Sequence, residues 1–269
     1  MCRIALQIKR TDRRVLAENS RPAEVSLVYL GEYQEGDRIV LSSSQAGTYL
    51  LIQLDDVMNP SFVYLSKSEF SFEIPFREKR ASYNPKAFTG GIHLLKARLA
   101  TDAEISMHKN LALNEYDCHG NDSCFPHAWA NVETRGESVF AARNAIDGNN
   151  ENRSHGVWPY ESWGINQNPD AEFCLDFGRM VEIDTIVLYT RADFPHDNWW
   201  KQAELTFSDG TSLNIMMEKL DRPHIFPLAK KTISWMKLAK LIKDENDSSP
   251  FPALSQIQVF GNEITIHKE

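Results

Sequence analysis

Short apolar or alternating segments recur along the first hundred residues, separated by polar turn formers. Most have the length and alternation of half-buried strands. Gly, Asn, Pro and Ser in the separators let the chain reverse, and strands at this spacing are typical of an antiparallel sandwich. The sequence therefore predicts a small β-sandwich. Its expected strands are VSLVYL (25–30), RIVL (38–41), TYLLIQL (48–54), FVYL (62–65), FSFEI (70–74), GIHLLKARL (91–99) and EISMH (104–108).

Two stretches interrupt this pattern. REKRASYNPKAFTGG (77–91) combines high charge, one Pro and paired Gly, which predicts a long exposed loop facing a partner or the second half of the chain. Residues 114–128 have no periodicity and many turn formers, which indicates a connection between domains. We therefore expect an N-terminal β-sandwich domain over 1–115 and a second domain over 116–269, with a boundary uncertainty of about ten residues.

Strand-like segments resume after this connection, and all six tryptophans lie in the second half. Four of these tryptophans fall in or beside segments rich in Pro, Asn, Asp and Gly, where a ring is not automatically part of a core. The expected strands are AEFCLDFG (171–178), EIDTIVLYTR (182–191), QAELTFSDG (202–210), TSLNIMM (211–217), TISWMKLAKLI (232–242) and SQIQVFG (255–261).

The bulk properties exclude several classes of partner. With 42% hydrophobic and 25% charged residues over 269 positions, the chain has the composition of a globular protein with enough apolar content for two cores. A net charge of −8 with scattered Lys and Arg disfavours nucleic acid and anionic membranes. The first residues lack the apolar core of a secretory signal, and no run approaches the roughly 20 apolar residues of a membrane span, so we expect a cytoplasmic location. The four cysteines are expected to be reduced thiols.

Over residues 126–261 the chain resembles the galactose-binding-like, discoidin (coagulation-factor C type) family and its related carbohydrate-binding modules. The resemblance implies an eight-stranded jelly roll whose loops at one end carry ligand specificity, and a binding module more often than an enzyme. It also favours a strand for KTISWMKLAKLI (231–242), whose periodicity fits an amphipathic helix as well. We recognise no family for the N-terminal domain. The segments that carry the resemblance are ARNAIDGN (142–149), AEFCLDFG, EIDTIVLYTR, LTFSDG (205–210) and SQIQVFG.

The resemblance also implies a calcium site. In the family an AxDG turn, here residues 145–148, often holds a structural calcium together with a downstream hydroxyl residue and a Glu of the last strand. Here Asn152 stands near the hydroxyl position and Gln256 at the Glu position. Because calcium favours anionic oxygens, a neutral amide weakens such a site. We therefore expect no cofactor and favour an Asx-type hydrogen bond of Asp147 in a tight turn, with Asp147 and Asn152 kept as candidate calcium ligands.

Two loops, SHGVWPYESWG (154–164) and RADFPHDNWWKQ (191–202), carry aromatic and polar side chains together. A sugar presents C–H faces and hydroxyl edges, so its site needs an aromatic platform surrounded by acids, amides and basic donors. Both loops supply this mixture, which predicts an oligosaccharide site. The candidate ligand-binding residues are the aromatic Trp158, Tyr160, Trp199 and Trp200 and the polar His155, Arg191, Asp193, His196, Asp197 and Asn198.

Burial competes with binding for the aromatic rings. Adjacent side chains on a strand point to opposite faces, so we expect Trp163 and one of Trp199 and Trp200 to lie in the core. The other ring, exposed beside polar groups, is expected to meet a ligand or a protein. DENDSSPFPALSQ (244–256) is predicted to be a surface loop that Phe251 and Leu254 pin to the core.

Catalysis has weaker support in the sequence. Asp197 follows His196, and a carboxylate that orients an imidazole is the arrangement of a general base, but neighbouring side chains in a loop generally diverge. The sequence also lacks a GxSxG nucleophile turn. Four acidic residues of this half have no spacing that selects a hydrolytic pair, namely Glu161, Asp170, Glu172 and Asp193.

The connection at 114–128 holds a second group of potential ligands. Cys and His bind zinc well, but Cys118 and Cys124 are separated by five residues and His119 and His127 by seven, which does not match compact zinc motifs. A structural role for these side chains is therefore the favoured interpretation.

Three functions remain open. We favour non-catalytic carbohydrate binding through the two loops. The first alternative is a sugar- or uronate-processing enzyme with His196, His155 or His127 as acid–base group and Arg191 holding a carboxylate, which a deep cleft between the domains would favour. The second alternative is a protein-assembly module whose apolar loops meet another protein or a second copy in a homo-oligomer.

Overall fold

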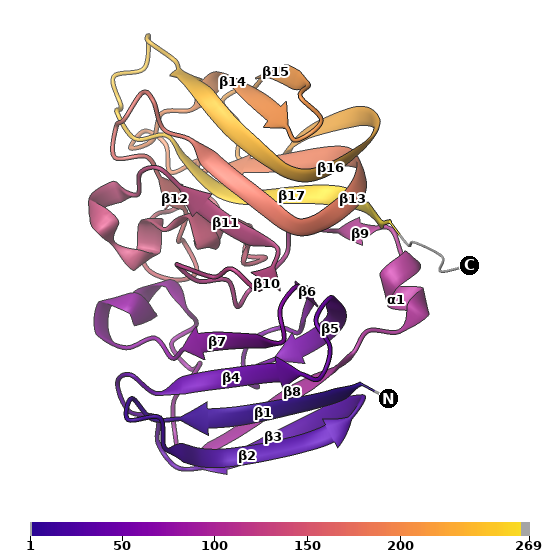
Figure 1. Cartoon of the computed structure of the whole chain (residues 1–269). Coiled ribbons are helices and arrows are strands. Elements are labelled where there is room, and N and C mark those ends of the chain that lie inside the picture. The colour runs from indigo at the N-terminus through magenta and orange to yellow at the C-terminus, as the bar shows by residue number, and fades with distance from the viewer. Residues whose placement is uncertain (1, 265–269) are drawn as a thin grey trace.

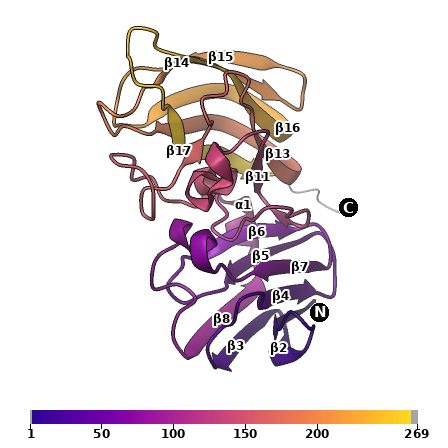
Figure 2. The same ribbon diagram turned by 90° about the vertical axis from the view of Figure 1, so that its left-hand side faces the viewer.

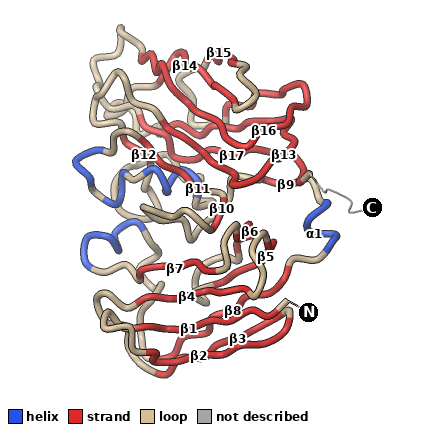
Figure 3. The backbone as a smooth tube through the Cα atoms, in the orientation of Figure 1, coloured by secondary structure: helices blue, strands red, loops and turns tan. Residues whose placement is uncertain are grey.

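The computed structural model describes residues 2–264. Within them the chain is built almost entirely of antiparallel strands, with one short α-helix and four short 3-10 turns (Figure 3). The early strands, indigo and purple in Figure 1, form the lower part of the molecule, and the later strands, pink to yellow, form the upper part. The prediction of an all-β protein is confirmed. None of the helices among the described residues has the length and apolar character needed to cross a membrane.

The lower part, here called the first unit, is a sandwich of two antiparallel sheets. One sheet has the order β2 (Val15–Pro22), β1 (Arg3–Lys9), β4 (Arg38–Ser43) and β7 (Glu69–Glu73). The other has the order β10 (Cys124–Phe125), β6 (Ser61–Leu65), β5 (Thr48–Gln53), β8 (Ile92–Leu99) and β3 (Glu24–Leu30).

The core of the first unit follows from alternation along its strands. In β1, Ile4, Leu6 and Ile8 are fully buried while the residues between them face outward. The predicted segments at 25–30, 38–41, 48–54, 62–65, 70–74 and 91–99 all contain strands.

The strand predicted at 104–108 is wrong. Residues Asp102–Ser106 form α1 instead. The hydroxyl of Thr101 accepts a hydrogen bond from the Glu104 amide, and the Glu104 carboxylate accepts one from the Thr101 amide. This capping box satisfies amides that the first turn of a helix would otherwise leave free, and so it stabilises the turn against the strand.

The upper part, here called the second unit, is built on an eight-stranded sheet that bends around its own core. The strands β13 and β16 are long and run antiparallel to each other; β11 pairs with the start of β13, and β17 pairs with the rest of it. The strand predicted at 231–242 is confirmed as part of β16. The strands are β9 (Lys109–Asn110), β11 (His127–Ala130), β12 (Trp163–Gly164), β13 (Phe173–Thr190), β14 (Trp200–Phe207), β15 (Ser212–Met216), β16 (His224–Lys243) and β17 (Ala253–Glu263).

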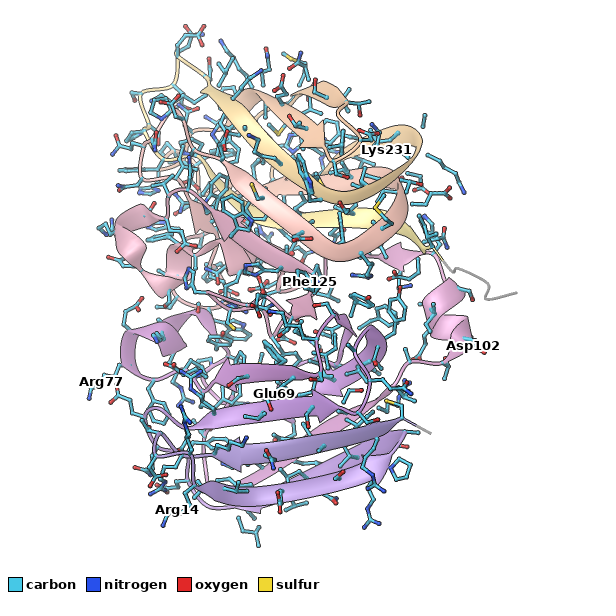
Figure 4. All side chains as sticks on the ribbon, viewed as in Figure 1. Arg14, Glu69, Arg77, Asp102, Phe125 and Lys231 are labelled. Atoms are coloured by element: carbon cyan, nitrogen blue, oxygen red, sulfur yellow. The ribbon has the colours of Figure 1, made fainter. Side chains whose placement is uncertain are left out.

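The connection at 114–128 is a buried and ordered bridge. Three of its residues are fully buried, namely Asn114, Tyr116 and Asp117. The side-chain amide of Asn114 donates to the carbonyl oxygens of Cys124 and Pro126. β10 adds to the first unit and β11 to the second. Phe125, which Figure 4 labels between the two units, covers Gly178, where a Cβ atom would lie 2.3 Å from its ring.

The chain crosses between the two hydrophobic cores more than once. Leu111 and Ala112 pack in the core of the second unit, whereas Tyr116 and Cys124 pack in the core of the first. The division into domains at 115/116 therefore stays a prediction.

The loop at 77–91 is less exposed than predicted. It contains a 3-10 turn at Arg77–Ser82, and Ala87 and Phe88 are buried in the first unit. The amide of Ser138 donates to Glu78 Oε1, and the amide of Trp158 donates to the Ala81 carbonyl oxygen. Figure 2 shows this turn, in purple, beside the pink helical turns of the second unit. The loop therefore does face the second half of the chain.

Candidate functional site

A partly open cavity of about 210 Å³, here called the loop pocket, lies among the loops that join the strands of the second unit. Its lining comes from the loop after β13, the loop before β17, the segments 134–140 and 164–167, and His155. Its aromatic and polar lining residues include Arg135, Phe140, His155, Asn166, Gln167, Arg191, His196 and Phe251.

A buried ion pair holds this loop cluster together. Arg191 is 4% exposed, and its Nε donates to both oxygens of the fully buried Asp197 carboxylate, at 2.9 and 3.0 Å, while its Nη2 donates to Oδ1. The same guanidinium donates to the Phe251 carbonyl oxygen at 3.1 Å. Asp197 also accepts from the amide of Asp193 at 2.8 Å. Such an enclosed pair is bidentate and largely desolvated, so it fixes the backbone of both loops.

Three flat side chains form one wall of the loop pocket. The rings of His155 and His196 are parallel, with centroids 4.2 Å apart and an interplanar angle of 2°. On the other side of His196 the ring of Phe251 stacks with a centroid distance of 5.2 Å. His155 Nδ1 lies 2.6 Å from Asp193 Oδ2, and His196 Nδ1 lies 3.0 Å from Asp197 Oδ1. The expectation that His196 and Asp197 diverge was therefore wrong.

These side chains do not form a metal centre as they stand. The donor atoms of His155, Asp193 and His196 lie within 4.8 Å of one another. An imidazole binds a metal along the lone pair in its ring plane. Because the two ring planes are parallel and stacked, those lone pairs run side by side and do not converge on a common point. The arrangement is a stack of rings whose edges carry the imidazole nitrogens.

The prediction that Phe251 and Leu254 pin their loop to the core is confirmed for Leu254, which is fully buried, and is wrong for Phe251. Phe251 is 41% exposed, and a proline on each side of it fixes the loop that presents its ring. Four further lining residues were not expected from the sequence, namely Phe140, Arg135, Asn166 and Gln167. Asn166 and Gln167 are exposed and have positive φ angles, so a tight loop carries their amides at the edge of the pocket.

Several predicted ligand-binding residues lie elsewhere. Trp200 is 1% exposed and packs beside Trp163 in the core, so its assignment to a ligand is corrected. Trp199 is half-buried, and the ammonium of Lys219 lies 5.3 Å from its ring centroid.

Asn198 is buried, and its side-chain amide donates to the carbonyl oxygens of residues 244, 247 and 249. Tyr160 does not line the loop pocket.

Asp197 is present at the loop pocket in a different role from the one predicted. Its two oxygens are occupied by Arg191, by the Asp193 amide and by His196. Because the carboxylate is fully buried, it orients other side chains and does not itself face a ligand.

Trp158 lies at a second cavity, of about 210 Å³, between the two units. This space is here called the junction cavity. Two residues predicted together in loop 154–164 therefore line different cavities. His155 lines the loop pocket, and Trp158 lines the junction cavity. Further residues around the junction cavity include Asn59, Tyr83, Glu115, Arg143, Asp147 and Glu161.

The residues at the expected calcium turn do not fit that ion as they stand. Asp147 Oδ1 accepts from the amide of Asn149, which is the Asx-type bond expected from the sequence. Gln256 Nε2 donates to Asp147 Oδ1 at 3.0 Å and to the Asn149 carbonyl oxygen at 2.9 Å. The side-chain N–H group of Gln256 thus donates to the two oxygens that would otherwise coordinate a cation. The side-chain amide of Asn152 donates a hydrogen bond to the Thr190 carbonyl oxygen at 2.8 Å.

A pair of buried carboxyl groups lies beside that turn. Asp147 and Glu161 are in contact, and Asn149 Nδ2 donates to Glu161 Oε1 at 2.9 Å. Burial, followed by the neighbouring Glu161 carboxylate, raises the pKa of Asp147 well above its usual value. Burial also raises the pKa of Glu161.

The Cys and His residues of the bridge have structural partners. His127 Nδ1 lies 2.7 Å from Asp117 Oδ1, and the other oxygen of Asp117 accepts from the amide of Ala128. Burial raises the pKa of Cys118 to about 12, so this thiol is protonated at neutral pH. These contacts fit the structural interpretation of the segment.

Comparison with known proteins finds similarity of this chain only to solved structures. No family model and no curated protein matches the chain. Chitosan-binding module 1 of a chitosanase/glucanase from Paenibacillus sp. IK-5 has 16% identity and a TM-score of 0.40 over 57% of this chain and 100% of that one. The family 32 CBM of C. perfringens NanJ, in complex with galactose, has 13% identity and a TM-score of 0.41 over 57% and 99%.

A fucose-binding module of Streptococcus pneumoniae has 13% identity and a TM-score of 0.41 over 57% of this chain and 98% of that one. These solved neighbours are carbohydrate-binding modules, and the sugars named for them are ligands of those proteins. At such TM-scores the likeness carries no argument for this chain, whose architecture rests on its own strand ladders.

Proposed function

We propose that this protein is a carbohydrate-binding protein whose site is the loop pocket. The observation that carries the proposal is the stack of His155, His196 and Phe251. The stacked rings cover one another's faces, so the aromatic surface offered to a ligand is the outer face of the stack, where Phe251 is 41% exposed, and the imidazole nitrogens lie at the edges. Such a surface suits the C–H face of a sugar, while neighbouring amides and imidazole nitrogens suit its hydroxyl groups. The resemblance to discoidin-type modules in the sequence of the second unit agrees with this function.

The charges of the pocket favour a neutral sugar over an acidic one. Arg191 is already paired with Asp197, and Arg135 forms a bidentate pair with Glu137 at 2.6 and 2.7 Å. The charge of each guanidinium is therefore offset by a neighbouring carboxylate, so the pocket has no uncompensated positive charge to attract an acidic sugar. The exposed amides of Asn166 and Gln167 remain as neutral donors and acceptors.

The experiment is a glycan-array screen of the intact protein followed by isothermal titration with the oligosaccharides that bind. We expect saturable binding of a neutral oligosaccharide that is lost in His196→Ala and kept in Trp199→Ala, because Trp199 lies away from the loop pocket. Absence of binding to every glycan by folded protein, or equal binding by the two variants, contradicts the proposal.

A sugar-processing enzyme is the second candidate. It is favoured by the contact between His196 Nδ1 and the buried Asp197 carboxylate, which leaves Nε2 as the nitrogen that can accept a proton. Turnover of a bound oligosaccharide that disappears in His196→Gln, with binding retained, would establish this activity. A cytoplasmic location and homo-oligomer formation through the apolar loops remain proposals from the sequence alone.

A further inference from the structure

A hollow on the face of a sheet, here called the aromatic groove, lies apart from the loop pocket and has a volume of about 360 Å³. Its lining comes from β11, from β13 with the residue before it, and from β16, three neighbouring strands in the upper part of Figure 1. Residues that alternate with its outward lining along β13, such as Phe173 and Phe177, fill the core of the second unit. The groove therefore lies on the side of the sheet that faces away from the core.

The strand register explains why this face is hollow. Trp129 lies opposite Cys174, and Cys174 lies opposite Lys237 on the other side of β13. Trp235 lies opposite Asp176. The two tryptophans thus stand on the strands that flank β13, two strands and two residues apart, which puts their Cα atoms about 12 Å from each other. Between the two large rings β13 carries only the small side chains of Cys174 and Asp176, and this difference in size forms the hollow.

Both rings that flank the hollow are open to solvent. Trp129 is 48% exposed and Trp235 is 42% exposed, whereas the other four tryptophans are half-buried or buried. Single exposed apolar side chains are normal on a protein surface, but large rings gathered around one hollow mark a binding surface. The aromatic groove is therefore a candidate ligand site.

The extent of the aromatic surface favours a small ligand over a protein. At these exposures the two rings offer on the order of 200 Å² of apolar surface. A stable protein interface buries about 800 Å² on each partner. The other outward side chains of the groove include Glu172, Asp176 and Lys237, so charged groups interrupt the apolar surface. The groove is thus too small and too polar for stable contact with a second copy of this chain.

The charges of the groove favour a neutral, hydroxylated ligand. Lys237 Nζ donates to Glu172 Oε1 at 2.8 Å, and both side chains stay partly exposed. Asp176 Oδ1 accepts from the Gly178 amide at 2.7 Å, so its other oxygen can accept from a ligand. A hydroxyl group donates to carboxylates and accepts from an ammonium, whereas a hydrocarbon would desolvate this ion pair and give no hydrogen bond in return. An anion would meet two carboxylates and one ammonium that is already paired.

We infer that the aromatic groove is a second carbohydrate site, which takes an extended neutral oligosaccharide with one sugar ring on Trp129 and another on Trp235. An indole ring suits the C–H face of a pyranose. Because the Cα atoms of the two tryptophans are about 12 Å apart, a ligand must be longer than one sugar to reach both rings. The groove and the loop pocket have no lining residue in common, so this inference does not depend on the loop pocket.

The experiment titrates the intact protein by calorimetry with four linear neutral sugars, namely cellohexaose, xylohexaose, mannohexaose and laminarihexaose. Trp129→Ala and Trp235→Ala test the groove, Trp129→Phe keeps an aromatic ring, and Phe251→Ala reports on the loop pocket. We expect at least one hexasaccharide whose affinity falls about tenfold or more in both tryptophan-to-alanine variants, with binding retained in Phe251→Ala and largely retained in Trp129→Phe. The matching monosaccharide should bind at least about tenfold more weakly, because it reaches only one indole.

The outcomes separate the two sites. Binding that is lost in Phe251→Ala and unchanged in both tryptophan-to-alanine variants overturns this inference and supports the loop pocket. Loss in only one of these two variants overturns the two-ring binding mode. Absence of binding by the wild type up to about 5 mM hexasaccharide overturns the groove as a sugar site, and a positive glycan array then still supports the loop pocket.

Sedimentation velocity tests the remaining occupant of this face. A wild-type dimer that dissociates in Trp129→Ala and binds no hexasaccharide would assign the groove to contact between copies and overturn the inference. A thermal melt of each variant excludes unfolding as the cause of a loss, and we expect small changes because both rings are exposed. Trp129→Phe keeps the test valid if the alanine variant does not fold, because retained binding by this variant still requires the ring.

Discussion

His196 Nδ1 lies 3.0 Å from the carboxylate of Asp197, its neighbour in the chain, and that carboxylate is fully buried. The contact arises because the loop curls, with the amide of Asp197 donating to the Asp193 carbonyl oxygen at 2.9 Å. Asp197 thereby connects the aromatic wall of the loop pocket to the buried guanidinium of Arg191. We therefore expect the loops of the pocket to depend on this carboxylate for their stability.

Asp197→Ala should lower the free energy of unfolding by about 3–5 kcal/mol, because it leaves the Arg191 guanidinium buried without its partner. Asp193→Ala is the matched control, since Asp193 is only half-buried and its side chain contacts one exposed imidazole. It should cost less than about 1 kcal/mol. Urea denaturation followed by circular dichroism measures both values. Equal losses would show that Asp197 does not organise the loops.

Phe251→Ala should weaken binding of the array-positive oligosaccharide by about tenfold or more, because it removes one ring of the aromatic wall. The melting temperature should change little, since the ring is 41% exposed. Trp199→Ala is the control, because this ring is half-buried beside Lys219 and does not line the loop pocket. Titration calorimetry distinguishes the two variants, and a similar loss of affinity in both would contradict the assignment.

The titration of Glu115 should make stability depend on pH. Burial raises the pKa of Glu115 from 4.5 to about 7, so the folded protein holds this proton more tightly than the unfolded chain does. The contribution to stability is complete below pH 4.5 and is lost as the pH rises through about 7. Its upper limit is about 3 kcal/mol. Glu115→Gln should flatten the unfolding free energy between these pH values relative to wild type, and an unchanged slope would contradict the shift.

Much of the fold could be predicted from the sequence, because apolar and polar residues alternate along its strands. Ile4, Leu6 and Ile8 in β1 alternate in this way, although residues 3–9 were not among the predicted strands. The short helix α1 was missed, since EISMH alternates like a strand and only the pairing of Thr101 with Glu104 decides the matter. Local hydrogen bonds thus outweigh a short pattern.

The candidate site was only partly accessible for a different reason. The loops at 154–164 and 191–202 were identified, but composition does not say which way a loop side chain points. Trp158 therefore entered a cavity with the first unit, and Trp200 entered the core. Phe251 was assigned to the core because apolar side chains usually are buried, whereas its flanking prolines present it to solvent.

The turn at Asp147 allows a sharp test of how this chain differs from the calcium-binding members of the family that it resembles. Gln256 Nε2 joins Asp147 Oδ1 and the Asn149 carbonyl oxygen, so wild-type protein should melt at the same temperature in EDTA and in calcium. Gln256→Glu replaces this donor by a carboxyl group that faces Asp147 and its neighbour Glu161. Without calcium the three carboxyl groups repel, and the free energy of unfolding should fall by about 1–3 kcal/mol.

Calcium should restore the stability of Gln256→Glu, because a cation can then coordinate carboxylate oxygens at the position where the amide donated. Gln258→Glu is the matched control, since it lies two residues along the same strand β17, is half-buried and should not respond to calcium. Thermal denaturation of both variants with calcium chloride and with EDTA measures the difference. A fall in the melting temperature of the wild type in EDTA would mean that its turn binds a divalent cation in solution and that Gln256 coordinates through its oxygen, which reverses the orientation of the amide on which this argument depends.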